Sequence, residues 1–376
     1  MQNIAIIGGG IAGLTAALAF ARRGFTVDLF EQAPAFREVG AGIQISPNAG
    51  RVLVALGLGG CLVRLGLPAR AVVSHDALTG RRIATFALDR QDPPYVFFHR
   101  ADLIDLLFGA CQEAGVRLHL DAAVRPSGAG GLRVGDDVVR ADLIVGADGL
   151  HSVLRPLVEP QAPAAAFTGQ VAWRAVIAAE AEPAATIWMA PGRHVVTYPL
   201  RDGRLNIVAV QERRDWAAEG WTHPDDPANL RAAFSECCAE LRNLLRQVTE
   251  PGLWGLFRHP VARHWFAGNM VLVGDAAHPT LPFLAQGANL AIEDAYVLAR
   301  HCAEAPDAAT ALARYRADRA PRVSRAIAAA EANARNYHLD GVARRAAHAA
   351  LRTVATVSPG AFLGRLSWLY DHDVTA

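Results

Sequence analysis

The sequence of 376 residues contains no lysine, so every one of its 37 Lys-or-Arg positions is an arginine. Neither a Schiff-base lysine nor a P-loop lysine is present, which excludes pyridoxal enzymes, lysine aldolases and P-loop nucleotide sites. The formal net charge is only +1. Nothing in the charge balance therefore indicates nucleic acid or an anionic membrane as a partner.

Cysteine is also scarce, with five residues at irregular spacing and no Cys-x-x-Cys pair. Neither a metal site nor a dithiol redox centre is expected, and reduced thiols in a cytoplasmic protein fit this usage. No apolar run reaches the roughly 18 residues that span a bilayer, and the N-terminus does not have the pattern of a signal peptide. Hydrophobic residues nevertheless make up 52% of the chain, and its length predicts two domains.

Residues 1–31 have the pattern of a dinucleotide-binding β–α–β unit. The continuous apolar run at 4–7 predicts a buried parallel strand. Small apolar residues at 14–23 predict a helix, and residues 26–30 predict a second strand.

Between the first strand and the helix, residues 8–13 read Gly-Gly-Gly-Ile-Ala-Gly and fit the pattern G-x-G-x-x-G. Gly8 allows the tight turn, Gly10 lets the backbone approach a pyrophosphate, and Gly13 lets the helix pack closely on the strand. The helix N-terminus offers N–H groups and a positive dipole to phosphate. Glu31 ends the second strand, where a carboxylate accepts ribose hydroxyls and disfavours a 2′-phosphate. This unit predicts dinucleotide binding without separating FAD from NAD.

Two later motifs place an aspartate and a glycine at the ends of apolar strands. Residues 142–146 lead into Asp148 and Gly149, and residues 271–275 end in Asp275. Ligands of open α/β sheets gather at this end of the strands, so both motifs are candidates for one ligand site. From the residues alone, Asp148 also fits a plain turn and Asp275 a helix N-cap.

Together the three motifs resemble the single-component FAD-dependent aromatic hydroxylases of the p-hydroxybenzoate hydroxylase type. That family carries an N-terminal G-x-G-x-x-G, a central Asp-Gly and a later Gly-Asp in the same order. The resemblance covers about residues 1–335. The strings at 99–103, 285–288 and 292–295 are most similar to the branch with 3-hydroxybenzoate 6-hydroxylase, salicylate hydroxylase and 6-hydroxynicotinate 3-monooxygenase. The implied fold is α/β, with a Rossmann-like FAD-binding domain, an inserted antiparallel-sheet substrate domain and C-terminal helices.

The resemblance implies an enzyme that hydroxylates a small aromatic acid, such as a hydroxybenzoate or hydroxynicotinate, with FAD, NADH or NADPH, and O2. In that family the oxygen is transferred from a flavin C4a-hydroperoxide. No second G-x-G-x-x-G follows a strand, so NADH or NADPH is expected to bind transiently, without a Rossmann site of its own. A quinone-precursor or polycyclic phenol hydroxylase and a flavin-binding redox sensor are the alternatives. A flavin halogenase requires a lysine that this chain lacks.

The resemblance also implies roles for individual residues in binding FAD. Asp275 would bind the ribityl or ribose part, Arg100 would lie near the pyrophosphate, and Val124 near the adenine. From the residues alone, Arg100 also fits a surface ion pair. Asp148 and Gly149 would support FAD and transient nicotinamide docking. Further expected contacts are Gly8, Gly10, Ala12, Gly13, Glu31, Gln32, Arg37, Gly42 and Ile43.

Around the flavin ring, Pro282 would flank the C4a position. Gly287, Ala288 and Asn289 would lie at flavin N1 and O2, just where a helix over 289–302 is predicted to begin. The N–H groups and dipole of that helix end suit the negative charge of reduced flavin.

The middle of the chain has the alternating pattern of an antiparallel sheet, with strands predicted at 171–177, 185–189, 194–199 and 205–211. Residues 227–247 look helical, and 71–98 look like strands that join the same sheet. The expected FAD-binding domain is then discontinuous, formed by 1–70, 99–165 and 259–335. The expected substrate domain comprises 71–98 and 166–258. Residues 336–376 would be a helical element for dimer formation or packing.

In the strand over 193–199, alternate side chains share a face, so His194 and Tyr198 point the same way, roughly 13 Å apart. The related branch has a His and a Tyr at this spacing before a Pro in its substrate site. The resemblance thus implies that His194 is the base for the substrate phenol and that Tyr198 contacts the substrate. Gln44 and Gln286 would flank the flavin, Gln44 near the substrate and Gln286 among the catalytic residues.

Several readings stay open at this stage. His194 by itself also fits a hydrogen-bonded structural residue, and His278 fits packing better than chemistry. Four further polar or aromatic residues are weaker candidates, because their inward and outward faces cannot be assigned from the sequence: Trp173, Arg174, Trp188 and Gln211.

Overall fold

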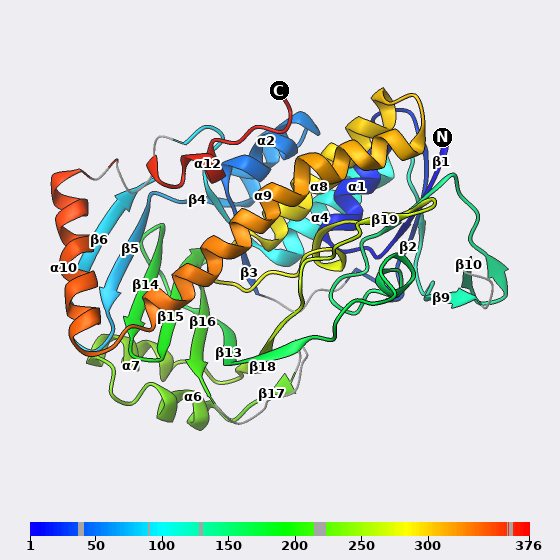
Figure 1. Ribbon diagram of the computed structural model, residues 1–376. Coiled ribbons are helices and arrows are strands. Elements are labelled where there is room, and N and C mark those ends of the chain that lie inside the picture. Colours follow the sequence, from blue (N-terminus) through cyan, green and yellow to red (C-terminus); the bar gives the residue numbers. More distant parts are fainter. Residues whose placement is uncertain (37–40, 89–90, 128–130, 214–222, 359, 361–363) are drawn as a thin grey trace.

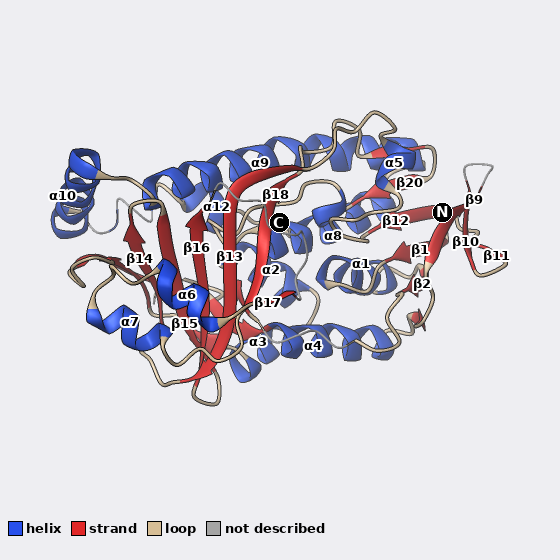
Figure 2. Ribbon diagram, turned by 90° about the horizontal axis from the view of Figure 1, so that it is seen from below, coloured by secondary structure: helices blue, strands red, loops and turns tan. Residues whose placement is uncertain are grey.

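The computed structural model describes the chain except for residues 37–40, 89–90, 128–130, 214–222, 359 and 361–363. Two large sheets form the body of the molecule, and one long helix runs along both of them (Figures 1 and 2). No helix in the described part of the chain is long and apolar enough to cross a membrane.

The first sheet carries the dinucleotide unit and has six strands. The pair of strands at one edge, Phe266–Ala267 with Met270–Leu272, is antiparallel, and all other neighbouring pairs are parallel. Its central strands are buried on both faces, as their continuous apolar sequences predict. The strand order is β19 (Phe266–Ala267), β20 (Met270–Leu272), β12 (Leu143–Gly146), β1 (Asn3–Ile7), β2 (Thr26–Phe30) and β8 (Arg117–His119).

Helix α1 (Ile11–Ala21) packs between α4 (Arg100–Glu113) and α8 (Gly287–Glu304). Its alanine- and leucine-rich sequence is buried on almost every side, which explains why no amphipathic stripe is visible in it. The helix expected over 14–23 begins earlier, directly after its N-cap Gly10. The helix expected over 289–302 likewise begins earlier, at Gly287, so both helix N-termini start within their glycine motifs.

The second sheet has eight strands, and the four strands expected in the middle of the chain are all present in it. One pair, β14 (Ala184–Ala190) with β5 (Ala71–Asp76), is parallel; every other neighbouring pair is antiparallel. These two strands come from distant segments, so no hairpin turn sets their relative direction. The full order is β17 (His223–Pro224), β18 (Gly252–Arg258), β13 (Ala166–Ala178), β16 (Arg204–Glu212), β15 (Arg193–Leu200), β14, β5 and β6 (Arg82–Ala87).

The expectation that all strands of 71–98 join this sheet is wrong for one of them. β7 (Val96–His99) instead lies between β3 (Gly42–Ile45) and β4 (Leu67–Pro68) in a small antiparallel sheet. Its Val-Phe-Phe sequence is fully buried in the main core, away from the eight-stranded sheet. A separate small sheet consists of β9 (Val124–Ser127), β10 (Gly131–Val134) and β11 (Asp137–Val138).

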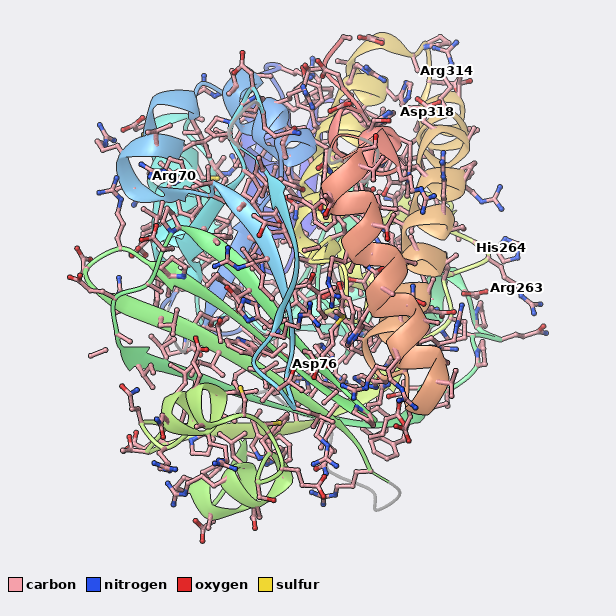
Figure 3. The ribbon with its side chains drawn as sticks, turned by 90° about the vertical axis from the view of Figure 1, so that its left-hand side faces the viewer. Arg70, Asp76, Arg263, His264, Arg314 and Asp318 are labelled. Atoms are coloured by element: carbon pink, nitrogen blue, oxygen red, sulfur yellow. The ribbon has the colours of Figure 1, made fainter. Side chains whose placement is uncertain are left out.

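The long helix is α9 (Ala308–Tyr337), and two further helices follow it in the region that was expected to be helical. α10 (Gly341–Val357) packs against β6, and Asp76 lies near it (Figure 3). Arg344 of α10 donates to both carboxylate oxygens of Asp76 at 2.9 Å. α12 (Ser367–Tyr370) returns to the core, where Arg322 of α9 donates to the carbonyl oxygens of Trp368 and Leu369, each at 2.9 Å.

The remaining helices are short. The region expected to be helical over 227–247 forms two separate helices, α6 and α7, because residues 234–238 interrupt it. The short helices are α2 (Pro47–Ala55), α3 (Gly59–Leu65), α5 (Arg155–Val158), α6 (Pro227–Ala233), α7 (Ala239–Leu245) and the 3-10 turn η1 (Gly274–Ala276).

Candidate functional site

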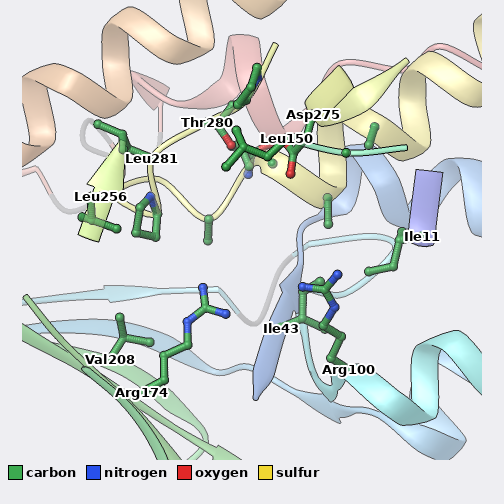
Figure 4. A pocket seen from close by; sticks show the side chains of 18 of the residues that line it. Ile11, Ile43, Arg100, Leu150, Arg174, Val208, Leu256, Asp275, Thr280 and Leu281 are labelled. Carbon is green, nitrogen blue, oxygen red and sulfur yellow. The ribbon is translucent and has the colours of Figure 1, made fainter. Parts of the chain in front are cut away.

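A cavity of about 300 Å³ is lined on one side by the ends of the six-stranded sheet and on the other by one face of the eight-stranded sheet (Figure 4). Its volume is at the lower end of the range for small-molecule sites. Most of the residues singled out in the sequence line it: Gly10, Ala12, Gly42, Ile43, Gln44, Arg100, Gly149, His194, Tyr198, Asp275, Pro282, Gln286, Gly287 and Ala288.

The other predicted residues do not line this cavity. Gln32 is exposed at the end of the dinucleotide unit, and Val124 is buried at the start of β9. Arg37 lies outside the described residues, so its expected role has no structural counterpart here. The rest of this group consists of Gly8, Gly13, Glu31, Asp148 and Asn289.

Two glycines of the G-x-G-x-x-G motif at residues 8–13, Gly10 and Gly13, differ in the space around them. A Cβ on Gly13 would lie 1.9 Å from the carbonyl oxygen of Gly8, so this position can only be a glycine if helix and strand are to pack as they do. A Cβ on Gly10 would meet nothing within 4 Å, because the space beside it is open. That open space faces the N-terminus of α1, where backbone N–H groups have no helical partner.

The side chain of Glu31 accepts one hydrogen bond from the G-x-G-x-x-G loop and one from the chain just after Glu31. Its Oε2 accepts from Gly9 N at 2.6 Å and its Oε1 from Ala33 N at 2.8 Å. The carboxylate is thereby held at the end of β2, beside the loop. Its contact with a ribose remains a prediction.

In the Asp-Gly motif, the side chain of Asp148 holds a turn. Its Oδ2 accepts from Val153 N at 2.7 Å and from Leu154 N at 3.3 Å. Gly149, rather than the carboxylate, lines the cavity. The turn role inferred as an alternative for Asp148 is therefore present, and its contact with FAD or nicotinamide stays a prediction.

The Gly-Asp motif differs from the expectation in one respect. The strand expected over 271–275 ends at Leu272, and Asp275 lies in the turn η1, where its side chain faces the cavity. Asp275 does not cap α8, because the N-cap residue of that helix is Gln286 and no side-chain cap hydrogen bond is present there. Burial raises the pKa of Asp275, and the charges of His278 and Arg100 oppose that shift.

Arg100 extends into the same cavity from the first turn of α4 (Figure 4). It is partly buried there.

The N-terminus of α8 forms another wall. The first helical hydrogen bond runs from Leu290 N to Gln286 O at 2.8 Å, which leaves the N–H groups of the three residues before Leu290 at the open end of the helix. Two of these residues, Gly287 and Ala288, line the cavity. The preceding Ala285 has a φ of 52°, a left-handed conformation that is strained for alanine.

The third residue of this helix end, Asn289, has a fully buried side chain that bonds to backbone. Its Nδ2 donates to Gln44 O at 3.0 Å and to Ala285 O at 2.7 Å, and its Oδ1 accepts from Ser46 N at 2.9 Å. The amide thus fastens the 44–46 segment to α8. Only the backbone N–H of Asn289 is left for the expected position at flavin N1 and O2.

Two carboxylates of α8, Glu293 and Asp294, are fully buried beyond its N-terminal turn, and the sequence analysis had assigned no role to them. Glu293 Oε2 lies 2.6 Å from Arg319 Nη1, and Asp294 Oδ1 accepts from Arg319 Nε at 2.7 Å. Asp294 Oδ2 lies 2.5 Å from His278 Nε2. Burial acts to raise the pKa of Asp294, but His278 and Arg319 outweigh it and lower that pKa to about 2. His278 is therefore a buried partner of Asp294, in line with the packing role expected for it.

On the opposite wall, His194 and Tyr198 share one face of β15 as predicted, and both line the cavity. His194 is 2% exposed, and its Nδ1 lies 2.7 Å from Nε2 of His338. Burial lowers the pKa of His194 well below its usual range, and the nearby His338 lowers it further. His194 is consequently a neutral imidazole at neutral pH.

Tyr198 connects this wall to the loop that carries Gly42 and Gln44. Burial raises the pKa of Tyr198, while the charge of Arg174 and a hydrogen bond with Gln44 act in the opposite direction. Gly42 N donates to Oδ1 of Asn206 at 2.7 Å, and a Cβ on Gly42 would lie 2.6 Å from the Tyr198 ring. Gly42 therefore permits close contact between this loop and the eight-stranded sheet.

Arg174 is a cavity residue that the sequence could not assign. It extends from β13 into the cavity, with its guanidinium carbon 4.4 Å from the ring centre of Trp254 (Figure 4). Trp254 lies on β18, a strand that was not predicted, because its sequence Gly-Leu-Trp-Gly-Leu-Phe-Arg does not alternate between apolar and polar residues. Trp173 and Trp188 point to the other face, where Trp173 Nε1 donates to Asp225 and Trp188 packs against His75.

Comparison with known proteins agrees with this geometry. A family model described as an FAD binding domain matches residues 1–330. The chain is 36% identical to the 3-amino-4-hydroxybenzoate 2-monooxygenase of Streptomyces platensis, and the match covers 99% of this chain and 96% of that one. It is 35% identical to the 3-hydroxybenzoate 6-hydroxylase of Polaromonas naphthalenivorans, with the same coverage. The chain belongs to the family of single-component FAD-dependent aromatic hydroxylases.

A more distant relative of this hydroxylase is the 6-hydroxynicotinate 3-monooxygenase of Bordetella bronchiseptica, at 33% identity over 86% of this chain and 89% of that one. Solved structures share the fold at lower identity. A salicylate hydroxylase substrate complex has a TM-score of 0.83 at 23% identity, covering 99% and 96% of the two chains. Klebsiella pneumoniae HpxO with FAD and uric acid has a TM-score of 0.83 at 24% identity, covering 96% and 97%.

The described residues of the hydroxylase fit FAD at both ends of the cavity. The open space at Gly10 and the N-terminus of α1 provide room and N–H donors for a pyrophosphate. At the other end, Gly287 and Ala288 present the N-terminus of α8, which suits a negatively charged flavin ring. Asp275 and Arg100 line the wall between these two helix ends.

Proposed function

We propose that this hydroxylase acts on a small aromatic acid that carries a phenolic or hydroxypyridine oxygen, with NADH or NADPH and O2 as co-substrates. One observation carries the proposal: Arg174, His194 and Tyr198 face the same cavity as the FAD-binding residues. A cation, a neutral imidazole and a phenol on one wall are complementary to a single ring that has both a carboxylate and a hydroxyl group.

Arg174 is proposed to hold the carboxylate of the substrate. A guanidinium presents donors in a planar fork that matches a carboxylate, and stacking on Trp254 orients the plane. The names of the three relatives support this assignment, since each describes a protein that acts on an aromatic acid with a ring hydroxyl.

His194 is proposed to accept the proton of the substrate hydroxyl. A neutral imidazole has a free lone pair, and the resulting phenolate ring is more electron-rich than the phenol. Burial raises the pKa of the Tyr198 phenol in this cavity, and the charge of Arg174 acts in the opposite direction. The same charge acts on a substrate hydroxyl in the cavity and favours its ionisation. FAD supplies the redox chemistry with NAD(P)H and O2.

The predicted roles of the other residues belong to the same proposal. Pro282 and Gln286 line the cavity and are proposed to lie beside the flavin, and Gln44, which has a hydrogen bond with Tyr198, is proposed to lie near the substrate. The nicotinamide is proposed to dock transiently near Asp148 and Gly149. The division into a discontinuous FAD-binding domain and an inserted substrate domain, a homodimer and a cytoplasmic location are also proposed.

The test is a screen of NADH and NADPH oxidation by the FAD-loaded protein with hydroxybenzoates, aminohydroxybenzoates and hydroxypyridine carboxylates. Product analysis by mass spectrometry and a peroxide assay separate hydroxylation from uncoupled oxidase activity. We expect at least one acid to accelerate NAD(P)H oxidation and to gain one oxygen atom. If only neutral phenols or polycyclic rings are hydroxylated, the acid assignment is wrong. If no aromatic compound affects the rate, a flavin-binding sensor is the better interpretation.

A further inference from the structure

His194 is the inner end of a chain of three hydrogen-bonded side chains that reaches the surface. Its Nδ1 lies 2.7 Å from Nε2 of His338, and Nδ1 of His338 lies 2.7 Å from Oε1 of Glu212. The His338 side chain is 3% exposed, whereas that of Glu212 is 53% exposed. The chain therefore begins at the cavity wall, passes through the core and ends in solvent.

The chemistry of these groups fixes which nitrogen carries each proton. An ionised Glu212 only accepts hydrogen bonds, so Nδ1 of His338 must donate to it. A neutral His338 then has a bare Nε2, which must accept from Nδ1 of His194. A neutral His194 is left with a bare Nε2 as its remaining ring nitrogen. This is the tautomer that a base facing the cavity requires.

Burial keeps the two imidazoles neutral. It lowers the pKa of His194, and it also lowers the pKa of His338, although the contact with Glu212 opposes the second shift. The groups around His194 are the rings of Phe283, Tyr337 and His338. Of the other titratable groups among the described residues that line the cavity, Arg174 and Tyr198 lie on the same sheet as His194.

We propose that His338 and Glu212 are positioning and relay residues, which set the tautomer of His194 and carry the phenolic proton of the substrate from the cavity to solvent. This inference rests on the proposed function, in which His194 accepts that proton. His338 lies at the C-cap of α9, so the C-terminal part of the chain takes part in the active site through it.

The proton balance of the relay is simple. The substrate O–H bond breaks and an N–H bond forms at Nε2 of His194. The Nδ1 proton of His194 moves to Nε2 of His338, and the Nδ1 proton of His338 moves to Glu212 and then to water. No electrons are transferred, and the net products are a bound phenolate and one proton in solvent. The starting tautomers return when Glu212 takes a proton from water, the two imidazole protons shift back, and Nε2 of His194 gives its proton to the phenolate oxygen of the product.

The experiment follows proton release when the FAD-loaded enzyme is mixed with 3-hydroxybenzoate in weakly buffered solution that contains a pH indicator dye. Stopped-flow absorbance reports the released proton, and the flavin spectrum reports ligand binding separately. The variants are Glu212→Gln, which keeps the shape but cannot pass on a proton, and His338→Ala. Glu236→Gln is the control, because it removes the same charge from an exposed carboxylate that lies near Arg193.

We expect Glu212→Gln and His338→Ala to slow proton release by about tenfold or more, within the range of general acid–base effects, with ligand binding retained. Added imidazole should restore the rate in His338→Ala, and Glu236→Gln should behave as the wild-type enzyme. A purely structural role for His338 would not produce rescue by imidazole. The backbone of His338 keeps its bond from Gly192 N in either variant.

Two outcomes overturn the relay in distinguishable ways. If His194→Ala abolishes proton release and hydroxylation while both relay variants release protons at the wild-type rate, the relay is wrong and the proposed function stands. If the wild-type enzyme binds 3-hydroxybenzoate and releases no proton, the base role of His194 fails, and the relay fails with it.

Discussion

Arg322 of α9 contacts both carboxylate oxygens of Glu293 of α8 in the interior of the protein, with its Nε 2.8 Å from Oε2 and its Nη2 2.7 Å from Oε1. This bidentate pair, together with Arg319, fixes the helix whose N-terminus borders the cavity. The geometry of the cavity therefore depends on charges buried one layer behind it.

The first prediction concerns this buried pair. Glu293→Gln should lower the free energy of unfolding by about 3–5 kcal/mol, because it leaves buried arginine charge with less compensation. Asp202→Asn, which removes an exposed ion pair with Arg204, should cost less than about 1 kcal/mol. Urea denaturation followed by tryptophan fluorescence measures both. Equal losses in the two variants would show that the buried pair contributes no more to the free energy of unfolding than the exposed pair.

The second prediction is a pH dependence of stability from Asp294. Its pKa is about 2 in the folded protein and about 3.9 in an unfolded chain, so the folded state favours the ionised form. The resulting contribution of about 2–3 kcal/mol is fully present above about pH 4 and is lost as the pH falls through 2. Asp294→Asn should be less stable at pH 7 and should lose less stability below pH 4 than the wild-type protein. Thermal melts across this pH range provide the measurement, and parallel curves would contradict it.

The third prediction separates two glycines of the fingerprint. Gly13→Ala should disrupt folding, since its Cβ would lie 1.9 Å from Gly8 O. Gly10→Ala should fold normally, because nothing lies within 4 Å of its Cβ and its φ of −71° suits alanine. It should nevertheless bind FAD more weakly, as the methyl group occupies the space proposed for the pyrophosphate. Circular dichroism and FAD titration of the apoprotein distinguish the two effects. Undiminished FAD affinity in Gly10→Ala would remove the pyrophosphate from this place.

The fourth prediction tests the carboxylate contact of Arg174. Arg174→Gln should weaken binding of 3-hydroxybenzoate by about 10- to 100-fold, the equivalent of one charge-assisted hydrogen bond. Binding of the neutral 3-hydroxybenzamide should change little. Arg204→Gln on the neighbouring strand β16 is the control, because its side chain pairs with Asp202 at the surface. Titrations followed by the flavin spectrum supply the dissociation constants. Equal losses for acid and amide would show that Arg174 does not recognise the carboxylate.

Much of the fold was predictable because its signals are local. The strand predicted over 26–30 has the same bounds as β2, since the segment Thr-Val-Asp-Leu-Phe lies between Gly24 and Glu31. The strand predicted over 194–199 agrees with β15 to within one residue at each end, because alternation and turn residues mark its limits. His194 and Tyr198 share a face for the same local reason, the two-residue period of a strand.

The features that were missed depend on contacts between distant segments. The parallel pairing of β14 with β5 joins residues more than a hundred positions apart. His194 and His338 are separated by 144 positions, and no local pattern links them. The inward direction of Arg174 follows from which face of the sheet meets the loop with Gly42 and Gln44, and the packing of distant segments decides this.

The hydrogen bonds from Arg322 to the carbonyl oxygens of Trp368 and Leu369 also have a consequence for biosynthesis. Chains fold from the N-terminus while they are being translated, so the dinucleotide unit leaves the ribosome before α12. Arg322 lacks these two carbonyl acceptors until residues 368 and 369 have been synthesised. We therefore expect the site to be complete for flavin binding only late in the synthesis of this enzyme.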